Sequence, residues 1–136
     1  FYITQVYSTI HKEESAMNEQ INIKPAHYTK DDIDHSIPAH CPRFEHASDI
    51  LGKRWTGLIL RLLQSGPMRF SELESHIPKL SPRMLSQRLR ELEEEQVITR
   101  DVHADRSVMV VYALTNKGEA MMPIIEAMQD WAETWC

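Results

Sequence analysis

The sequence predicts a domain of the α+β class, mostly α-helical, over residues 41–136 of a 136-residue chain. Three observations lead to this prediction. Apolar residues recur every three to four positions in several short segments, which is the period of an amphipathic helix. Two runs of β-branched and apolar residues flank a short polar stretch, as in a β-hairpin. Apolar residues make up 42% and charged residues 26%, which excludes a wholly disordered or collagen-like chain.

Two short helices are expected at the start of this domain. The first begins at Pro42, since proline fits the first turn of a helix, and its apolar positions continue until Gly52. The second carries an apolar stripe from Trp55 to Leu63. It stops at residues 65–67, where the sequence Ser-Gly-Pro terminates helices.

A third short helix and a longer fourth helix follow. A brief extended bridge over residues 68–70 precedes the third helix, which starts at Ser71 and is ended by Pro78. Ser81 then comes directly before a proline. Serine caps the free amide groups of a helix and proline suits its first position, so we expect the fourth helix over residues 82–96.

A hairpin and a terminal helix complete the domain. Residues 97–100 and 108–114 are strand-like and flank the polar residues 104–107. Thr115 resembles a helix cap, and one helix is expected from there to the chain end. The second, third and fourth helices followed by the hairpin are typical of a winged helix-turn-helix. In this motif the last helix of the trio enters the major groove of DNA.

The fourth helix has two chemically different faces. Leu85, Leu89 and Leu92 share the face that we expect to pack on the core. The candidates for DNA binding on the opposite face and at the capped start are Ser81, Arg83, Ser86, Gln87 and Arg90. Arginine donates twice to guanine, glutamine pairs with adenine, and serine or free helix amides hold phosphate. The alternative is a solvent-facing helix whose polar residues serve solubility.

The distribution of charge favours the DNA-binding interpretation. The chain has a net charge of −5, but residues 53–106 hold 10 basic and 8 acidic residues. The fourth helix has no acid up to Arg90, and its acids at positions 91 and 93–95 are expected beyond the reach of the groove, where phosphate repels them less.

Four further basic residues are weaker candidates. Lys53 and Arg54 precede the second helix and are candidates for clamping phosphate. Arg106 at the hairpin tip is a candidate for the minor groove or a phosphate, although Asp105 beside it argues for an ordinary solvent-facing turn. Arg88 lies nearer the core-side edge of the fourth helix and is at most a phosphate contact.

A series of motifs recurs in order along this segment. These motifs are Cys41-Pro42, Asp49-Ile50-Leu51-Gly52-Lys53-Arg54-Trp55, Leu58-Ile59-Leu60, Gly66-Pro67-Met68-Arg69-Phe70-Ser71-Glu72-Leu73, Ile77-Pro78, Ser81-Pro82-Arg83-Met84-Leu85 and Leu89-Arg90-Glu91-Leu92-Glu93. Over residues 41–136 they closely resemble the HxlR-type, or DUF24, branch of the MarR-like bacterial transcription regulators. The resemblance implies a homodimeric repressor or activator on a pseudo-palindromic operator of double-stranded DNA, with no catalytic activity and no cofactor. Two departures concern the wing, because Gln96 stands where the family usually has glycine and the family's frequent prolines are missing.

The terminal helix is the expected dimerisation element. It displays more apolar surface than a small core can cover, namely Met121, Ile125, Met128, Trp131 and Trp135. The alternative is one more core helix. A two-fold dimer would place two recognition helices one DNA turn apart, roughly 34 Å.

Cys41 is the candidate redox sensor. It lies at a predicted helix start between His40 and Arg43, and each of these features favours the reactive thiolate. The resemblance implies that many members sense electrophiles, quinones or oxidants through a cysteine at this position, whereas the residues alone also fit a buried inert cysteine. Cys136 is a candidate resolving thiol. Because these two cysteines lie 95 positions apart, they form no disulfide scaffold of the small secreted kind, and a reducing compartment is expected.

Other function classes are less well supported. His35, His40, Cys41 and His46 suggest a metal sensor, but no second pair of closely spaced ligands accompanies them. An enzyme is disfavoured, because the chain has only 4 glycines and lacks the G-x-S-x-G, phosphate-loop and H-E-x-x-H motifs. A regulator that responds to a ligand without thiol chemistry, or a winged-helix protein-interaction module, remains an alternative. Such a module would tolerate acids at positions 83, 87 and 90.

The first 40 residues differ from the rest. They are polar, interrupted by Pro25 and Pro38, and lack a sustained apolar period, so we expect an N-terminal arm, with residues 1–16 upstream of the first methionine a candidate extension. No run approaches the roughly 18 apolar residues of a membrane-spanning helix. The chain start also lacks the features of a secretory signal, which favours a cytoplasmic protein without a membrane partner.

Overall fold

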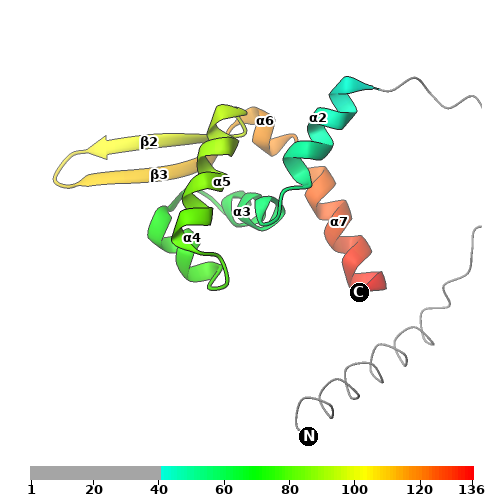
Figure 1. Ribbon diagram of the computed structural model, residues 1–136. Helices are drawn as coiled ribbons and strands as arrows, with labels where there is room; N and C mark the ends of the chain where they lie inside the picture. The colour runs from blue at the N-terminus through cyan, green and yellow to red at the C-terminus, as the bar shows by residue number, and fades with distance from the viewer. Residues whose placement is uncertain (1–40) are drawn as a thin grey trace, which may run out of the picture. The chain divides into compact units, whose positions relative to one another are not determined.

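The computed structural model describes residues 41–136, which form a mixed α+β domain that is mostly helical, as predicted (Figure 1). The expected arm, residues 1–40, lies outside the described residues. The elements are α2 (Pro42–Leu51), α3 (Thr56–Gln64), β1 (Met68–Arg69), α4 (Phe70–His76), α5 (Pro82–Glu94), β2 (Ile98–Ala104), β3 (Val108–Leu114), α6 (Asn116–Glu119) and α7 (Met122–Trp135). Within residues 41–136, no helix combines the length and the apolar character needed to cross a bilayer.

The sheet has three antiparallel strands in the order β1-β3-β2. β2 is longer than predicted from the sequence, because residues 101–104 pair in register with residues 111–108 of β3. The turn is therefore confined to residues 105–107. β1 contributes two pairs, from Met68 to Tyr112 and from Arg69 to Val111, which attach the start of α4 to the hairpin. The hairpin projects away from the helices, and α7 lies at the opposite end of the domain (Figure 1).

The core lies between the helices and the base of the hairpin. It consists mainly of apolar side chains from α3, α5 and α7, with single residues from α4, β2 and β3 and a few from the connecting segments. The predicted inner face of α5 is confirmed, because Leu85, Leu89 and Leu92 are 0%, 1% and 2% exposed. Burying each of these side chains stabilises the fold by roughly 1.5–3 kcal/mol, so the opposite face of α5 is held outward.

The C-terminal segment contains two helices where the sequence predicted one. Thr115 caps α6 as expected, because its Oγ1 accepts a hydrogen bond from the amide of Gly118 at 3.1 Å. The helical structure is then interrupted between Glu119 and Met122, and α7 begins with Pro123 in its first turn. Proline lacks the N–H that a continuous helix would need to bond the carbonyl of Glu119.

α2 differs from the other long helices in its packing. None of its ten residues is buried. Ile50 and Leu51, at its carboxyl end, are partly buried against the core. In the middle of α2, His46 Nε2 lies 2.9 Å from Oε2 of Glu95, the residue directly after α5. α2 is therefore attached to the domain mainly at one end.

Candidate nucleic-acid interface

The start of α5 is built as the sequence predicted. Ser81 has extended backbone angles, and its Oγ accepts a hydrogen bond from the amide of Met84 at 3.2 Å. Pro82 occupies the first turn, which contains no acidic residue. The partial positive charge of this helix end is therefore not offset locally, which suits an anion such as phosphate.

The outer face of α5 brings the predicted DNA-binding residues together. Arg83, Ser86, Gln87 and Arg90 are exposed and line one shallow groove along the helix. Glu91 and Glu94 line the same groove. The prediction that the acids lie beyond this surface is wrong, because positions 87, 90, 91 and 94 share one side of the helix.

Glu91 is the centre of a polar network that sequence reasoning missed. Its Oε1 accepts from Gln87 Nε2 at 3.2 Å, and its Oε2 accepts from Lys53 Nζ at 3.2 Å and from Arg88 Nη1. Partial burial alone would raise the pKa of Glu91. The hydrogen bonds from Gln87 and Lys53 and the charges of Arg88 and Lys53 outweigh burial, so the pKa lies below its usual value. The i to i+4 spacing of Gln87 and Glu91 was the available signal.

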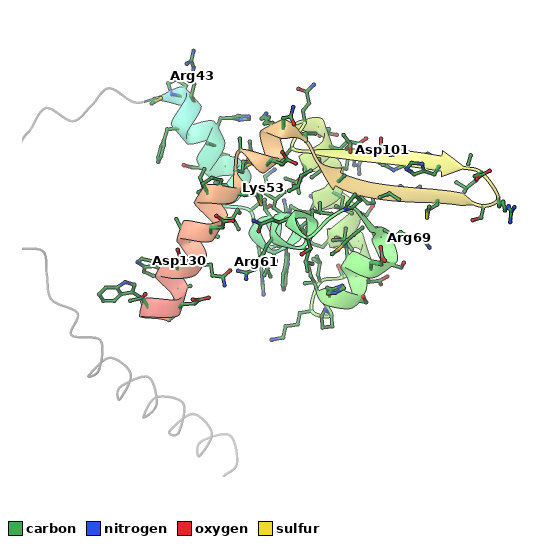
Figure 2. All side chains as sticks on the ribbon, turned by 180° about the vertical axis from the view of Figure 1, so that it is seen from behind. Arg43, Lys53, Arg61, Arg69, Asp101 and Asp130 are labelled. Carbon is green, nitrogen blue, oxygen red and sulfur yellow. The ribbon has the colours of Figure 1, made fainter. Side chains whose placement is uncertain are left out.

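None of the weaker basic candidates lines this groove, although Arg88 and Lys53 contact Glu91, which does. Arg88 is only 8% exposed and pairs with Glu91, so it faces the domain rather than a phosphate. Lys53, in the segment between α2 and α3, also pairs with Glu91, and Figure 2 shows it at the end of the domain away from Asp101 on the hairpin. Arg106 is exposed in the hairpin turn, where the sequence placed it.

Arg54 lies beside an unusual backbone position. Its guanidinium carbon is 4.6 Å from the centre of the Trp55 ring. Trp55 has a φ of 77°, in the left-handed region that bulky residues rarely adopt. This cation–π contact covers the aromatic ring just before α3 begins, and it directs Arg54 toward its own chain.

The expected dimer surface divides into an inner and an outer part. Ile125 is 4% exposed and belongs to the core of this chain, and Met121 packs partly against that core. The remaining predicted residues are open to solvent: Met128, Trp131 and Trp135 are 54%, 59% and 43% exposed. Ile124 on α7 and Leu58 on α3 are also exposed, and neither was predicted.

Both cysteines are free and exposed. Cys41 is the residue directly before α2, and it is exposed to solvent. The alternative of a buried, inert cysteine is therefore wrong. Within residues 41–136, no three His, Cys, Asp or Glu side chains come together as a metal site would require. His35 and His40 of the metal-sensor alternative lie outside the described residues.

Comparisons with known proteins identify the family. A sequence profile described as HxlR-like helix-turn-helix matches residues 50–136. An uncharacterised HTH-type transcriptional regulator of Bacillus subtilis, YvaP, is 52% identical over 95 residues, which are 70% of this chain and 88% of the relative. The HTH-type transcriptional regulator YodB of the same organism is 45% identical over 96 residues, 71% of this chain and 86% of YodB.

Solved structures agree with these sequence relatives. The reduced form of YodB superposes with a TM-score of 0.66 at 44% identity and covers 71% of this chain and 95% of that chain. YodB has also been solved treated with diamide and bound to quinone, with TM-scores of 0.63 and 0.61. The redox regulator HypR in its reduced form gives a TM-score of 0.64 at 33% identity over 68% of this chain and 91% of HypR. With its winged helix-turn-helix fold and its exposed basic face on α5, this chain belongs to the HxlR-like helix-turn-helix family of DNA-binding transcriptional regulators.

Proposed function

We propose that this protein is a homodimer that binds an operator in double-stranded DNA through α5 and changes its DNA binding when an oxidant or electrophile reacts with Cys41. The observation that carries the proposal is the exposed row of Arg83, Gln87 and Arg90 on a helix whose opposite face is locked into the core. A rigid helix that presents such side chains outward fits the major groove.

The predicted DNA-binding residues of α5 and of the hairpin turn have different proposed roles. Arg83 and Arg90 donate to guanine, and Gln87 contacts an adjacent base. Ser81, Ser86 and the free amides of the helix start bind phosphate and fix the position of the helix on the duplex. Arg106, in the exposed hairpin turn, contacts the neighbouring minor groove or backbone.

Arginine substitutions test the role of α5. In Arg83→Ala or Arg90→Ala we expect operator binding to weaken by about 1–3 kcal/mol, with a relaxed base preference at one position. Arg43→Ala is the matched control, because it removes the same charge from an exposed position on α2. Fluorescence anisotropy at fixed salt measures the affinity. Equal affinity in all four proteins would reject the assignment of α5 as the recognition helix.

The exposed side of α7 supports the dimer. Met128, Trp131 and Trp135 are about half exposed, and large apolar side chains gathered in this way mark interfaces. In Trp131→Ala we expect a shift toward monomer in sedimentation velocity, with an unchanged far-UV circular dichroism spectrum. Asp130→Ala, a polar change at the adjacent position of the same helix, should leave the dimer intact. A monomeric wild-type protein at micromolar concentration would refute this part of the proposal.

The exposed thiol before α2 supports sensing at Cys41, and the diamide-treated and quinone-bound forms of YodB show which reagents act on a relative. A thiolate adds to a ring carbon of a quinone, the displaced electron pair moves to a quinone oxygen that takes up a proton, and the product is a thioether of the hydroquinone. Diamide takes one hydrogen from each of two thiols and leaves a disulfide. The first thiol is Cys41, and the second is either Cys136 or the Cys41 of a second copy of the chain. Both reactions place the modification at Cys41, the residue directly before α2.

Serine variants separate these chemistries. Cys41→Ser should bind the operator normally and no longer respond to quinone or diamide. Cys136→Ser should keep the response to quinone, and it loses the response to diamide only if Cys136 is the resolving thiol. If wild type and Cys41→Ser respond alike, the sensor assignment fails and the response belongs to another group.

A further inference from the structure

The carboxylate of Glu91 has a different partner on each oxygen. Oε2 receives Lys53 Nζ, 3.2 Å away, together with Arg88 Nη1. Oε1 receives the amide nitrogen of Gln87 at 3.2 Å, one helical turn earlier on α5. One oxygen is therefore neutralised by two cations, and the other is left for a side chain in the proposed DNA-binding groove.

The two cations fix the position of this carboxylate. The Arg88 side chain is only 10% exposed, and Lys53 reaches Glu91 from the segment before α3. The side chain of Glu91 itself is 26% exposed, less than is usual for an acid on an outer helix face. Its Oε1 is thus a fixed hydrogen-bond acceptor, not a freely rotating one.

A fixed acceptor determines which end of the Gln87 amide faces outward. A glutamine amide has a donor arm, the NH₂ group, and an acceptor arm, the carbonyl oxygen. Since the nitrogen donates to Glu91, the oxygen is on the arm turned away from Glu91. In the major groove adenine and cytosine present an amino donor, whereas guanine and thymine present carbonyl acceptors.

We propose that Glu91 is a positioning residue that determines base specificity: it holds the Gln87 amide with its oxygen toward the DNA, so that Gln87 prefers adenine or cytosine over guanine or thymine. This inference rests on the proposed function of α5. It assigns a role in recognition to an acid that phosphate repulsion alone would exclude from the surface.

Glu91→Gln provides the sharpest test, because it keeps the shape of the side chain. The oxygen of the new amide takes the place between Lys53 and Arg88, and its nitrogen then faces Gln87. A nitrogen there donates to the Gln87 oxygen and turns the Gln87 amide over, with its NH₂ group outward. We expect the base preference at this one position to invert toward guanine or thymine, by about threefold to tenfold.

The assay compares four operator duplexes that differ only at the base facing Gln87, found as the position at which Gln87→Ala loses selectivity. The matched control is Glu94→Gln, which removes the same charge from the same groove. This control should raise affinity for all four duplexes equally without a change in preference. In the Gln87→Ala background, Glu91→Gln should likewise change no preference.

Three results would overturn the inference. The first is an unchanged preference in folded Glu91→Gln, and the second is the same inversion in the Gln87→Ala background. The third is wild-type selectivity in Glu91→Asp. This variant retains the charge but is one methylene shorter, so it should relax the base preference without inverting it. If no α5 variant alters binding at any position, the proposed function of α5 itself fails.

Discussion

Gly118 on α6 packs directly against the backbone of Val97 and the side chain of Leu114, where the wing meets the terminal helices. A Cβ atom added at this position would lie 2.2 Å from the carbonyl oxygen of Val97 and 3.1 Å from Leu114 Cδ2. Real Cβ contacts essentially never fall under 3.0 Å. In Gly118→Ala, α6 must therefore move away from Val97, the residue directly before β2.

That movement has a calculable cost. The Val97 carbonyl accepts hydrogen bonds from the amide and the hydroxyl of Thr115, at 3.1 and 3.0 Å, and both weaken when α6 shifts. Forcing an extra methyl group into a packed site costs about 1–3 kcal/mol, and weakening a part-buried hydrogen bond adds about 1 kcal/mol. We expect a total near 3 kcal/mol, which lowers the melting temperature by about 10–25 °C for a domain of this size.

Differential scanning calorimetry measures this change, with Gly57→Ala as the control. At Gly57 the nearest atom to an added Cβ is Met128 Cε, 3.3 Å away at the flexible end of a side chain. Alanine is also favoured over glycine inside a helix by up to about 1 kcal/mol. Gly57→Ala should therefore melt at or above the wild-type temperature. A Gly118→Ala protein that melts within a few degrees of wild type would show that the packing argument is wrong.

Three further changes test other contacts of α5. Ser81→Ala removes the hydroxyl that caps the Met84 amide and should lower the free energy of unfolding, measured by urea denaturation, by about 1 kcal/mol. Ser81→Asp should restore this stability but weaken DNA binding. A Ser81→Ala protein as stable as wild type would refute the capping role. Gln96 has a φ of 58°, so Gln96→Gly should raise the free energy of unfolding by about 0.5–1 kcal/mol, and a loss of stability would contradict this. The pKa of Glu91 is lowered in the folded state, so its carboxylate stabilises the fold above the unfolded pKa of about 4.3, and this contribution is lost as the pH falls through the folded value. Urea midpoints measured from about pH 7 down to pH 3 should therefore fall more steeply for wild type than for Glu91→Gln, and parallel curves would count against the shift.

The features that the sequence predicted well are local. The start of α5 follows from a serine cap and a proline within two residues, and its inner face follows from three leucines at helical spacing. The end of α5 was placed two residues too far, because Glu95 and Gln96 already form the turn that closes the helix. In that turn the amide of Gln96 bonds the carbonyl of Glu93, and the amide of Val97 bonds that of Leu92.

The features that the sequence did not predict depend on contacts between distant residues. β2 extends over residues 101–104 because β3 supplies partners for them, although their composition resembles a loop. From the sequence alone, Lys53 and Arg88 are weak candidates for phosphate, because each is a cation near a helix, and Glu91 is only an acid that DNA would repel. The pairing of Glu91 with both cations depends on the fold. The left-handed backbone at Trp55 has no local signal such as glycine.

The shallow anchoring of α2 has a thermodynamic consequence for the proposed sensing role. α2 has no fully buried residue and packs on the core only through the partly buried Ile50 and Leu51, so moving it costs little hydrophobic free energy. A hundredfold change in the ratio of two placements requires only about 2.8 kcal/mol. Under the proposed sensing role, a modification at Cys41, directly before α2, would need to supply no more than this difference to change the placement of the helix.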